Sequence, residues 1–280
     1  MTLTDALHSL AQAGMPRLEA QNLLLMALGR DPHDRAWLLA HDTDALDESA
    51  NARLQTLVQR HRDGEPMGYL RGEQEFFGLP LRVDARVLVP RPDTETLVQW
   101  SLEVLDALPL PINNASAIDL GTGSGAIALA LASQRPGLAI TATDASEAAL
   151  AVARQNAERL GLAVQLAAGH WFAAVPGQRF HLAVSNPPYI AEGDPHLPAL
   201  RHEPISALTA GPDGLDDIRT LVAQAPAHLH PGGWLLLEHG HDQAPAVQAL
   251  LRQAGFVDVS SRTDLAGIAR CTGGRWPAAR

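Results

Sequence analysis

Hydrophobic positions follow two different spacings, which change at about residue 65. In residues 1–64 apolar side chains recur at helical spacing in four stretches, beginning with TDALHSLAQAG and ending with DALDESANARLQTLVQRHRDG. Breaks rich in Gly, Pro and Asp separate these stretches, and such residues stop helices or cap their first turns. The pattern predicts a small helical domain over residues 1–64.

Beyond that domain the spacing becomes shorter, and residues 65–90 carry aromatic side chains with Gly78 and Pro80 near the middle. This pattern is typical of a β-hairpin that links two domains. From residue 91 to 280 apolar runs alternate with Ala-rich stretches, which predicts an α/β domain whose mostly parallel sheet is covered by helices. The expected strands are SAIDL, AITAT, AVQLA, FHLAVS, WLLLEH and VDVSS, and the expected helices include residues 124–135, 146–160 and 242–254.

Composition narrows the class of protein. The chain has 280 residues, of which 46% are hydrophobic and 19% charged, as in globular proteins of one or two domains. It contains no apolar run long enough to span a bilayer, and its start lacks the pattern of a secretory signal, so we expect a cytoplasmic protein. The single Cys271 excludes an internal disulfide framework and a multi-cysteine zinc site. Every basic residue is Arg, which excludes a Walker-type lysine and Schiff-base chemistry.

The charge balance bears on the class of partner. Basic residues number 21 and acidic residues 31, for a formal net charge of −10. A protein that follows nucleic-acid phosphates over many contacts is normally basic, so nucleic acid is a disfavoured partner. A cationic ligand or a basic protein suits the negative field better.

A glycine-rich turn follows the first expected strand of the second domain, in the sequence AIDLGTGSGAIALALA. Gly121, Gly123 and Ala126 satisfy the dinucleotide fingerprint, and Asp144 follows where an acid would accept from ribose hydroxyls. Asp119 would repel a pyrophosphate but attract the cationic sulfonium and ammonium groups of S-adenosyl-L-methionine. The turn therefore favours S-adenosyl-L-methionine, with NAD and a purely structural turn as alternatives.

The expected strand FHLAVS runs into Asn186, Pro187, Pro188 and Tyr189. Ligands of open α/β sheets bind beyond the carboxyl ends of the strands, so this segment and the glycine turn should face one crevice. The Asn186 side-chain oxygen and the Pro187 carbonyl can accept both hydrogens of an NH₂ group and orient its weakly nucleophilic nitrogen. The two prolines stiffen the segment, and Tyr189 offers a ring for a planar group. The segment predicts methyl transfer to an amide or aromatic amine nitrogen, although prolines that simply end a strand are the structural alternative.

Further stretches extend these two motifs over nearly the whole chain: HRDGEPMGYLRGEQEFFGLPL, VLVPRPDTETLV, EPISALTAGPDGLDDI and GGWLLLEHG. With them the chain resembles the class I S-adenosyl-L-methionine-dependent methyltransferases, which have a Rossmann-like sheet, and within them the peptide-chain release factor glutamine methyltransferases. The resemblance implies methylation of the side-chain nitrogen of the glutamine in the Gly-Gly-Gln loop of class 1 release factors. We also expect a monomer.

The motifs and the resemblance together indicate which residues bind each ligand. Cofactor-binding residues would be Asp119, Gly121, Thr122, Gly123, Ser124, Gly125, Asp144, His170, Trp171 and Asn186. The substrate glutamine would contact Asn186, Pro187, Pro188 and Tyr189, with the catalytic role on Asn186, Pro187 and Tyr189. The family commonly has Asp where this chain has His170, and a neutral His could accept from the adenine amino group through one ring nitrogen.

Three other functions fit part of the sequence. The Asn-Pro-Pro-Tyr motif is shared with adenine methyltransferases of DNA, which the acidic charge disfavours. A sibling family that acts on a ribosomal protein looks similar but usually reads Pro-Arg-Ser-Pro where this chain has Pro-Arg-Pro-Asp at residues 90–93. A binding module without chemistry would have no use for two acceptors aimed at one NH₂ group.

Two other clusters have simpler explanations. The LLLEHGHD stretch offers Glu238, His239, His241 and Asp242 as metal ligands, but neighbouring strand residues face opposite ways, so no metal is expected. In the PRPDTE stretch, Asp93 or Thr94 suits the N-cap of the following helix and Glu95 its first turn, which is compatible with a role beside the cofactor.

Overall fold

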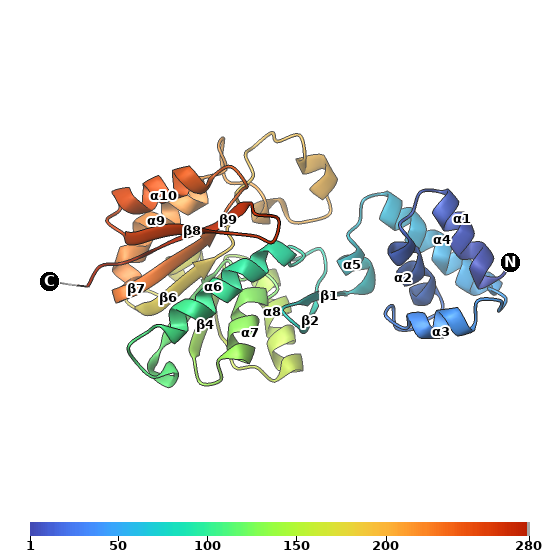
Figure 1. The fold of residues 1–280 in the computed structure, drawn as a ribbon, viewed down its shortest axis with the longest axis horizontal. Coiled ribbons are helices and arrows are strands. Elements are labelled where there is room, and N and C mark those ends of the chain that lie inside the picture. The colour runs from blue at the N-terminus through green and yellow to red at the C-terminus, as the bar shows by residue number, and fades with distance from the viewer. Residues whose placement is uncertain (279–280) are drawn as a thin grey trace. The chain divides into compact units, whose positions relative to one another are not determined.

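The computed structural model describes residues 1–278, and the chain divides between Glu73 and Gln74 into two compact units. The division falls within the predicted linker. The first unit is helical, as predicted, and the second is a mixed α/β domain (Figure 1). No helix among residues 1–278 is both long and apolar enough to cross a membrane.

Helices of the first unit begin at capping residues that the sequence supplies. Thr2 and Asp5 form a capping box, in which each side chain accepts from the other residue's backbone N–H. The Asp47 side chain caps a later helix by accepting from the Ala50 N–H at 2.7 Å. Apolar faces dominated by leucine pack into one core. The helices are α1 (Leu3–Gln12), α2 (Arg17–Ala27), α3 (Arg35–Ala40), α4 (Glu48–Arg62) and α5 (Met67–Arg71).

The predicted hairpin is formed by β1 (Glu73–Phe76) and β2 (Leu79–Arg82). Its two-residue loop, Phe77 and Gly78, has φ of 51° and 77°. Positive φ at both loop positions is what a type I′ turn requires, and this turn matches the twist of hairpin strands.

The second unit contains a seven-stranded sheet in the order β5-β4-β3-β6-β7-β9-β8. All pairings from β5 to β7 are parallel, whereas β9 pairs antiparallel with β7 and with β8. The order reverses between β3 and β6, which creates the crevice where ligands of such sheets bind. The strands are β3 (Ser116–Leu120), β4 (Ala139–Asp144), β5 (Gln165–Ala168), β6 (Phe180–Ser185), β7 (Leu229–Glu238), β8 (Val257–Thr263) and β9 (Ala269–Arg275).

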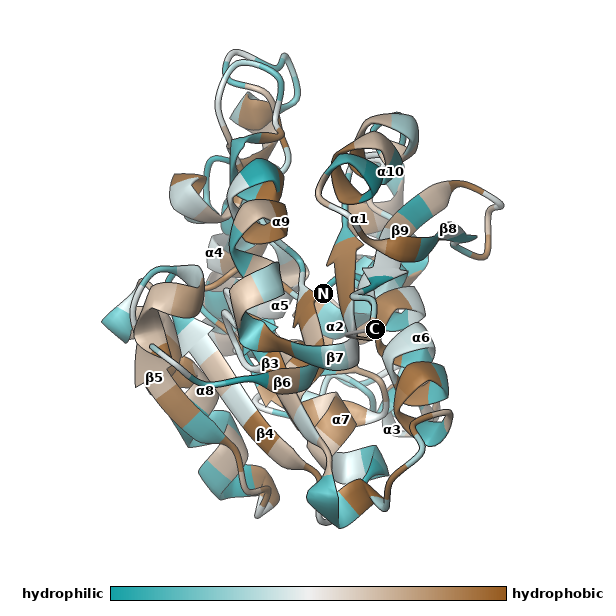
Figure 2. Ribbon diagram, turned by 90° about the vertical axis from the view of Figure 1, so that its left-hand side faces the viewer, coloured by the Kyte–Doolittle hydropathy of each residue, from teal (hydrophilic) through white to brown (hydrophobic). Residues whose placement is uncertain are grey.

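Helices cover both faces of this sheet (Figure 1). One core lies beneath α6 (Glu95–Asp106), α7 (Ala126–Gln134) and α8 (Glu147–Leu160), and the other beneath α9 (Asp216–His228) and α10 (Ala244–Gln253). Because neighbouring strand residues face opposite ways, each central strand needs apolar side chains at nearly every position. Hydrophobic residues accordingly recur along the strands (Figure 2).

All six predicted strands and the three predicted helices are present, with ends shifted by a few residues. The sequence did not predict β9, because its two consecutive glycines are typical of loops. The structure explains one of them: a Cβ atom on Gly273 would lie 2.8 Å from the backbone carbonyl oxygen of Leu235 in β7. Close approach of the neighbouring strand therefore requires glycine there.

Candidate active site

The glycine turn and the Asn-Pro-Pro-Tyr segment leave the sheet from adjacent strands. The turn follows β3 and the segment follows β6, and these strands pair in parallel with Asp119 beside Val184. The Ser185 hydroxyl donates to the Leu120 carbonyl at 2.6 Å, which fixes the two strand ends to each other. The two motifs therefore lie at one edge of the sheet, as predicted.

Backbone groups hold the glycine turn. Gly121, Gly123 and Gly125 have φ of 74°, 56° and 86°, which non-glycine residues rarely adopt. The N–H groups of Gly121 and Thr122 both donate to the Thr143 carbonyl, at 2.8 and 2.9 Å. A Cβ atom on Gly121 would lie 2.8 Å from Cζ3 of a tryptophan ring, whereas one on Gly123 would meet nothing within 4 Å. The turn is thus packed on one side and open on the other.

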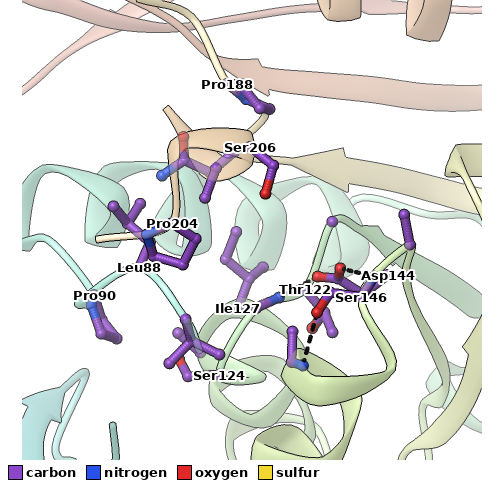
Figure 3. Close-up of a pocket in the computed structure, with 18 of the residues that line it drawn as sticks. Leu88, Pro90, Thr122, Ser124, Ile127, Asp144, Ser146, Pro188, Pro204 and Ser206 are labelled. Atoms are coloured by element: carbon purple, nitrogen blue, oxygen red, sulfur yellow. Dashed lines mark hydrogen bonds between the residues drawn. The ribbon is translucent and has the colours of Figure 1, made fainter. Parts of the chain in front are cut away.

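Asp144 is fixed beside the open side of the turn. Its Oδ2 atom accepts from the Gly123 N–H at 2.9 Å, and its Oδ1 atom accepts from the Ser146 N–H at 2.8 Å. Figure 3 shows this carboxylate beside Thr122 and Ser146 at the cavity wall. Each carboxylate oxygen can accept a further hydrogen bond, so Asp144 can bind two hydroxyl groups of a ligand.

Asp119 does not face the cavity, where it was expected to attract the positively charged groups of the cofactor. It is buried and does not line the cavity; its Oδ2 atom accepts from the Thr122 hydroxyl at 2.6 Å and from the Ala128 N–H at 3.2 Å. Burial raises its pKa to about 7. A carboxyl buried behind the turn, outside the cavity and with a raised pKa, neither contacts a cationic ligand nor faces a pyrophosphate directly. The structure therefore assigns Asp119 to holding the turn on α7, and the charge argument against NAD fails.

His170 and Trp171 follow β5 and both line the cavity. Trp171 has a φ of 52° and its ring is buried, with Nε1 donating to Oδ1 of Asp217 at 3.3 Å. The His170 ring lies edge-on to the indole at 5.1 Å between ring centroids. Asp217, in the first turn of α9, also lines the cavity and was not predicted from the sequence.

The cavity beside the glycine turn has a volume of about 270 Å³. Predicted residues on its wall are Gly121, Thr122, Gly123, Ser124, Asp144, His170, Trp171, Asn186 and Pro188. Gly125, Pro187 and Tyr189 do not line it. Apolar side chains that the sequence did not single out complete the wall, including Leu88, Ile127 and Pro204 (Figure 3).

A second cavity of about 360 Å³ adjoins the first. Asn186 lines both cavities, whereas Tyr189 lines only the second, together with Leu200 and Leu208. The Asn-Pro-Pro-Tyr segment is held by a distant stretch of chain, because the Tyr189 and Ile190 N–H groups donate to the Leu208 carbonyl at 3.2 and 2.8 Å. Asn186, with Leu88, Arg91 and Ala207, thus lines both the cavity beside the glycine turn and the cavity beside the tyrosine.

The PRPDTE stretch contributes to both cavities, and of its predicted helix-start roles only that of Glu95, in the first turn of α6, is confirmed. Thr94 immediately precedes α6, but its side chain makes no cap hydrogen bond, so the predicted capping role is wrong for this residue. Its hydroxyl instead accepts from Nδ2 of Asn186 at 3.2 Å. Asp93 forms an ion pair with Arg270 at 3.3 Å, and Glu95 accepts from the Phe77 N–H at 3.0 Å. The stretch ties the hairpin and β9 to the site.

A buried glutamate fixes the start of the same stretch. Glu203 accepts from the Val89 N–H at 2.9 Å and from Nη2 of Arg91 at 2.5 Å. Its side chain is 1% exposed, whereas that of Arg91 is 38% exposed and lines both cavities. Removing one partner of such a buried pair leaves an uncompensated charge. Glu203 therefore positions the wall that the two cavities share.

Residues 238–242 do not converge. Glu238 and His239 are buried; the His239 ring contacts the Gly240 carbonyl and the Thr272 hydroxyl, at 2.8 and 2.7 Å. His241 and Asp242 are exposed. Glu238 faces the hydroxyl of Tyr189 at 3.5 Å, a contact that the sequence did not predict.

Comparison with known proteins places the chain in a family. The sequence profile of the PrmC N-terminal domain matches residues 2–72, and that of the methyltransferase small domain matches residues 101–206. The release factor glutamine methyltransferase of Bordetella pertussis is 51% identical over 98% of this chain and 99% of its own length. That of Pseudomonas aeruginosa is 48% identical over 93% and 92%. The chain belongs to the release factor glutamine methyltransferase family.

The fold of this methyltransferase is shared more widely. The T. thermophilus 16S rRNA N2 G1207 methyltransferase superposes with a TM-score of 0.54 over 73% of this chain and 49% of its own, at 20% identity. At that identity the likeness concerns the fold alone.

One residue that supports the glycine turn was not predicted from the sequence. Asn156 of α8 is fully buried, and its Nδ2 atom donates to the carbonyls of Ser124 and Arg82, at 2.9 and 3.0 Å. Its Oδ1 atom accepts from the Arg82 N–H at 2.7 Å. One side chain therefore joins the glycine turn to the hairpin. The only available signal was a polar residue on the apolar face of a helix.

Proposed function

We propose that this protein transfers a methyl group from S-adenosyl-L-methionine to the side-chain amide nitrogen of the glutamine in the Gly-Gly-Gln loop of class 1 release factors. The observation that carries the proposal is the position of Asn186, whose side chain borders both cavities. One cavity suits a cofactor and the other an acceptor side chain. Relatives named release factor glutamine methyltransferase, which match this chain over nearly their full length, support the choice of substrate.

The first cavity fits S-adenosyl-L-methionine. This cofactor supplies a methyl group bound to a positively charged sulfonium sulfur. Asp144 has its oxygens fixed by two backbone N–H groups and can accept from the two ribose hydroxyls. Gly123 leaves the turn open to close approach by a ligand. Val87, Leu88 and Ile127 give the wall the apolar character that an adenine ring and a methionine chain require.

The second cavity suits the acceptor glutamine. An amide nitrogen is a weak nucleophile because its lone pair is delocalised, so its orientation has to be fixed. The Asn186 side-chain oxygen and the Pro187 carbonyl are the proposed acceptors for its two hydrogens, although of these two residues only Asn186 lines the cavities. Tyr189 can pack its ring on the planar amide, and Leu200 and Leu208 exclude water around it. No titrating base is needed before methyl transfer.

The proposal extends to where the enzyme works, to its class of acceptor and to its oligomeric state. Release factors act on ribosomes, so we infer that the enzyme works in the cytoplasm. A net charge of −10 disfavours nucleic acid as the acceptor. We expect the enzyme to act as a monomer, since both cavities are built from residues of one unit.

Intact-mass analysis tests the function. Incubation of a folded class 1 release factor with enzyme and S-adenosyl-L-methionine should add the mass of one methyl group. A release factor in which Ala replaces the Gly-Gly-Gln glutamine should gain no mass. Methylation of that control, or of an adenine-containing DNA duplex in preference to the factor, would contradict the proposal. Calorimetry with NAD in place of S-adenosyl-L-methionine should show no binding signal, as expected from membership of a methyltransferase family.

A further inference from the structure

The side-chain amide of Asn186 has two ends with opposite hydrogen-bonding character. The oxygen only accepts and the nitrogen only donates, and the two ends have nearly the same shape. If the nitrogen faced the substrate, it would repel the acceptor NH₂ group instead of orienting it. Something must therefore determine which end of the amide is free.

Thr94 occupies the position that decides this. Its hydroxyl oxygen lies 3.2 Å from Nδ2 of Asn186, and the threonine is only 4% exposed. A hydroxyl can donate or accept, so on its own Thr94 could bind either end of the amide. The next group along must fix the direction of its hydrogen.

That next group is Glu238, at the carboxyl end of β7. Its Oε1 atom accepts from the Tyr189 hydroxyl at 3.5 Å, and hydrogen bonding by the Thr94 hydroxyl lowers its pKa. An ionised carboxylate has no hydrogen to donate. When Glu238 is ionised, the Thr94 hydroxyl can only donate toward it, which leaves the Thr94 oxygen to accept from Asn186. The chain of donors runs from Asn186 through Thr94 to Glu238.

We propose that Thr94 and Glu238 are positioning residues that bind the NH₂ end of the Asn186 amide and so leave its oxygen free for the acceptor. The proposal rests on the proposed function for the identity of that acceptor. A threonine that merely filled space would not need a buried acid behind it. The Glu238 residue is only 1% exposed, and its Oε2 atom has no hydrogen-bond partner among residues 1–278. Such burial of a carboxyl group is costly.

The groups around Glu238 determine the pH range in which the hydrogen bonds from Asn186 through Thr94 to Glu238 run in one direction. Burial and, to a smaller extent, Asp93 raise its pKa, the hydrogen bonds and Arg270 lower it, and the result is a pKa of about 7. Cys271 lies opposite on β9, and burial raises its pKa above its ordinary value, so it stays neutral. Above pH 7 Glu238 is a carboxylate and fixes the direction. Below pH 7 a protonated Glu238 can donate to Thr94, and the constraint weakens.

Two substitutions of Thr94 separate positioning from filling of space. Thr94→Val keeps the shape but removes the hydroxyl, whereas Thr94→Ser keeps the hydroxyl. The rate at saturating cofactor and release factor should fall roughly 10- to 100-fold in Thr94→Val and stay within about 3-fold in Thr94→Ser. KM for the release factor should change little in either. Thr141→Val, at a buried threonine of β4 outside both cavities, is the control and should keep the parent rate.

The pH profile supplies a second readout. The parent kcat should rise as pH passes through about 7, and Glu238→Gln should have a lower kcat without that rise. A parent-like rate in Thr94→Val, or an equal loss in Thr94→Ser, would overturn the proposal. An unchanged pH inflection in Glu238→Gln would overturn the role of the carboxylate.

A measurement that needs no substrate distinguishes failure of this proposal from failure of the proposed function. In protein labelled with ¹⁵N-asparagine, the side-chain NH₂ signals of Asn186 are assigned by their loss in Asn186→Ala. They should shift in Thr94→Val, remain close to the parent in Thr94→Ser, and titrate with Glu238. If the Asn186 NH₂ signals are unchanged in both Thr94→Val and Thr94→Ser, the positioning role is rejected. This holds whether or not the enzyme methylates a release factor.

Discussion

The glycine turn and the Asn-Pro-Pro-Tyr segment lie at the same edge of the sheet but are stabilised in different ways. The turn takes its shape from glycines within five consecutive residues and from backbone bonds to the next strand. The Asn-Pro-Pro-Tyr segment depends in addition on Thr94 and Glu238, which lie 92 and 49 residues away in the sequence. The cofactor half of the site is therefore locally encoded, whereas the acceptor half depends on tertiary structure.

The largest effect is expected from removing the side chain that the two halves share. Asn186→Ala deletes the proposed acceptor for the substrate NH₂ group but leaves the turn and Asp144 unchanged. By comparison with loss of a preorganised polar group in other enzymes, kcat should fall roughly 10²- to 10³-fold. Methyl-transfer rates at saturating cofactor and release factor measure it. A nearly unchanged rate would contradict the acceptor role of Asn186 and favour the structural alternative, in which the prolines only end the strand.

A glycine substitution tests the cofactor half of the site. Gly121→Ala introduces a Cβ atom 2.8 Å from the Trp171 ring at a φ of 74°, so the turn must shift away from its cofactor-binding shape. We expect Kd for S-adenosyl-L-methionine to rise roughly 10- to 100-fold by calorimetry, at about 1.4 kcal/mol for each factor of ten. Gly161→Ala is the matched control, because its φ is 65° but a Cβ atom there meets nothing within 4 Å. Equal weakening in both variants would attribute the loss to general destabilisation.

A third prediction concerns stability rather than ligand binding, through the buried acid behind the turn. Asp119 has an ordinary pKa of 3.8, which burial raises to about 7 in the folded protein. Between these values the folded state holds the proton more tightly than the unfolded state, so the free energy of unfolding falls as pH rises. Above pH 7 the contribution is constant.

Asp119→Asn removes this titration. Its free energy of unfolding should fall less steeply between pH 4 and 7 than that of the parent, by up to about 1.4 kcal/mol per pH unit. Urea titrations at several pH values measure the two slopes. Glu238 contributes equally to both proteins and cancels. Parallel slopes would show that Asp119 stays ionised in the folded state.

The same division between local and tertiary encoding explains what the sequence could predict. Strand, turn and helix around the glycines are adjacent in the chain, so periodicity and motif were enough to place them. The orientation of Asp119 was missed because it depends on how α7 packs on β3. Thr94 was assigned to a helix cap because its partner, Asn186, lies 92 residues away. Glu238 and Asn156 carry no local signal of their contacts.

One paired measurement tests the central claim that the two halves have separate roles and meet at Asn186. Cofactor Kd by calorimetry and kcat at saturating cofactor are determined for both Asn186→Ala and Gly121→Ala. We predict that Asn186→Ala keeps Kd within about 3-fold of the parent and loses at least roughly 10²-fold in kcat. Gly121→Ala should show the larger change in Kd and the smaller change in kcat. If Asn186→Ala instead weakens the cofactor as much as Gly121→Ala does, the two halves are not separate and the account is wrong.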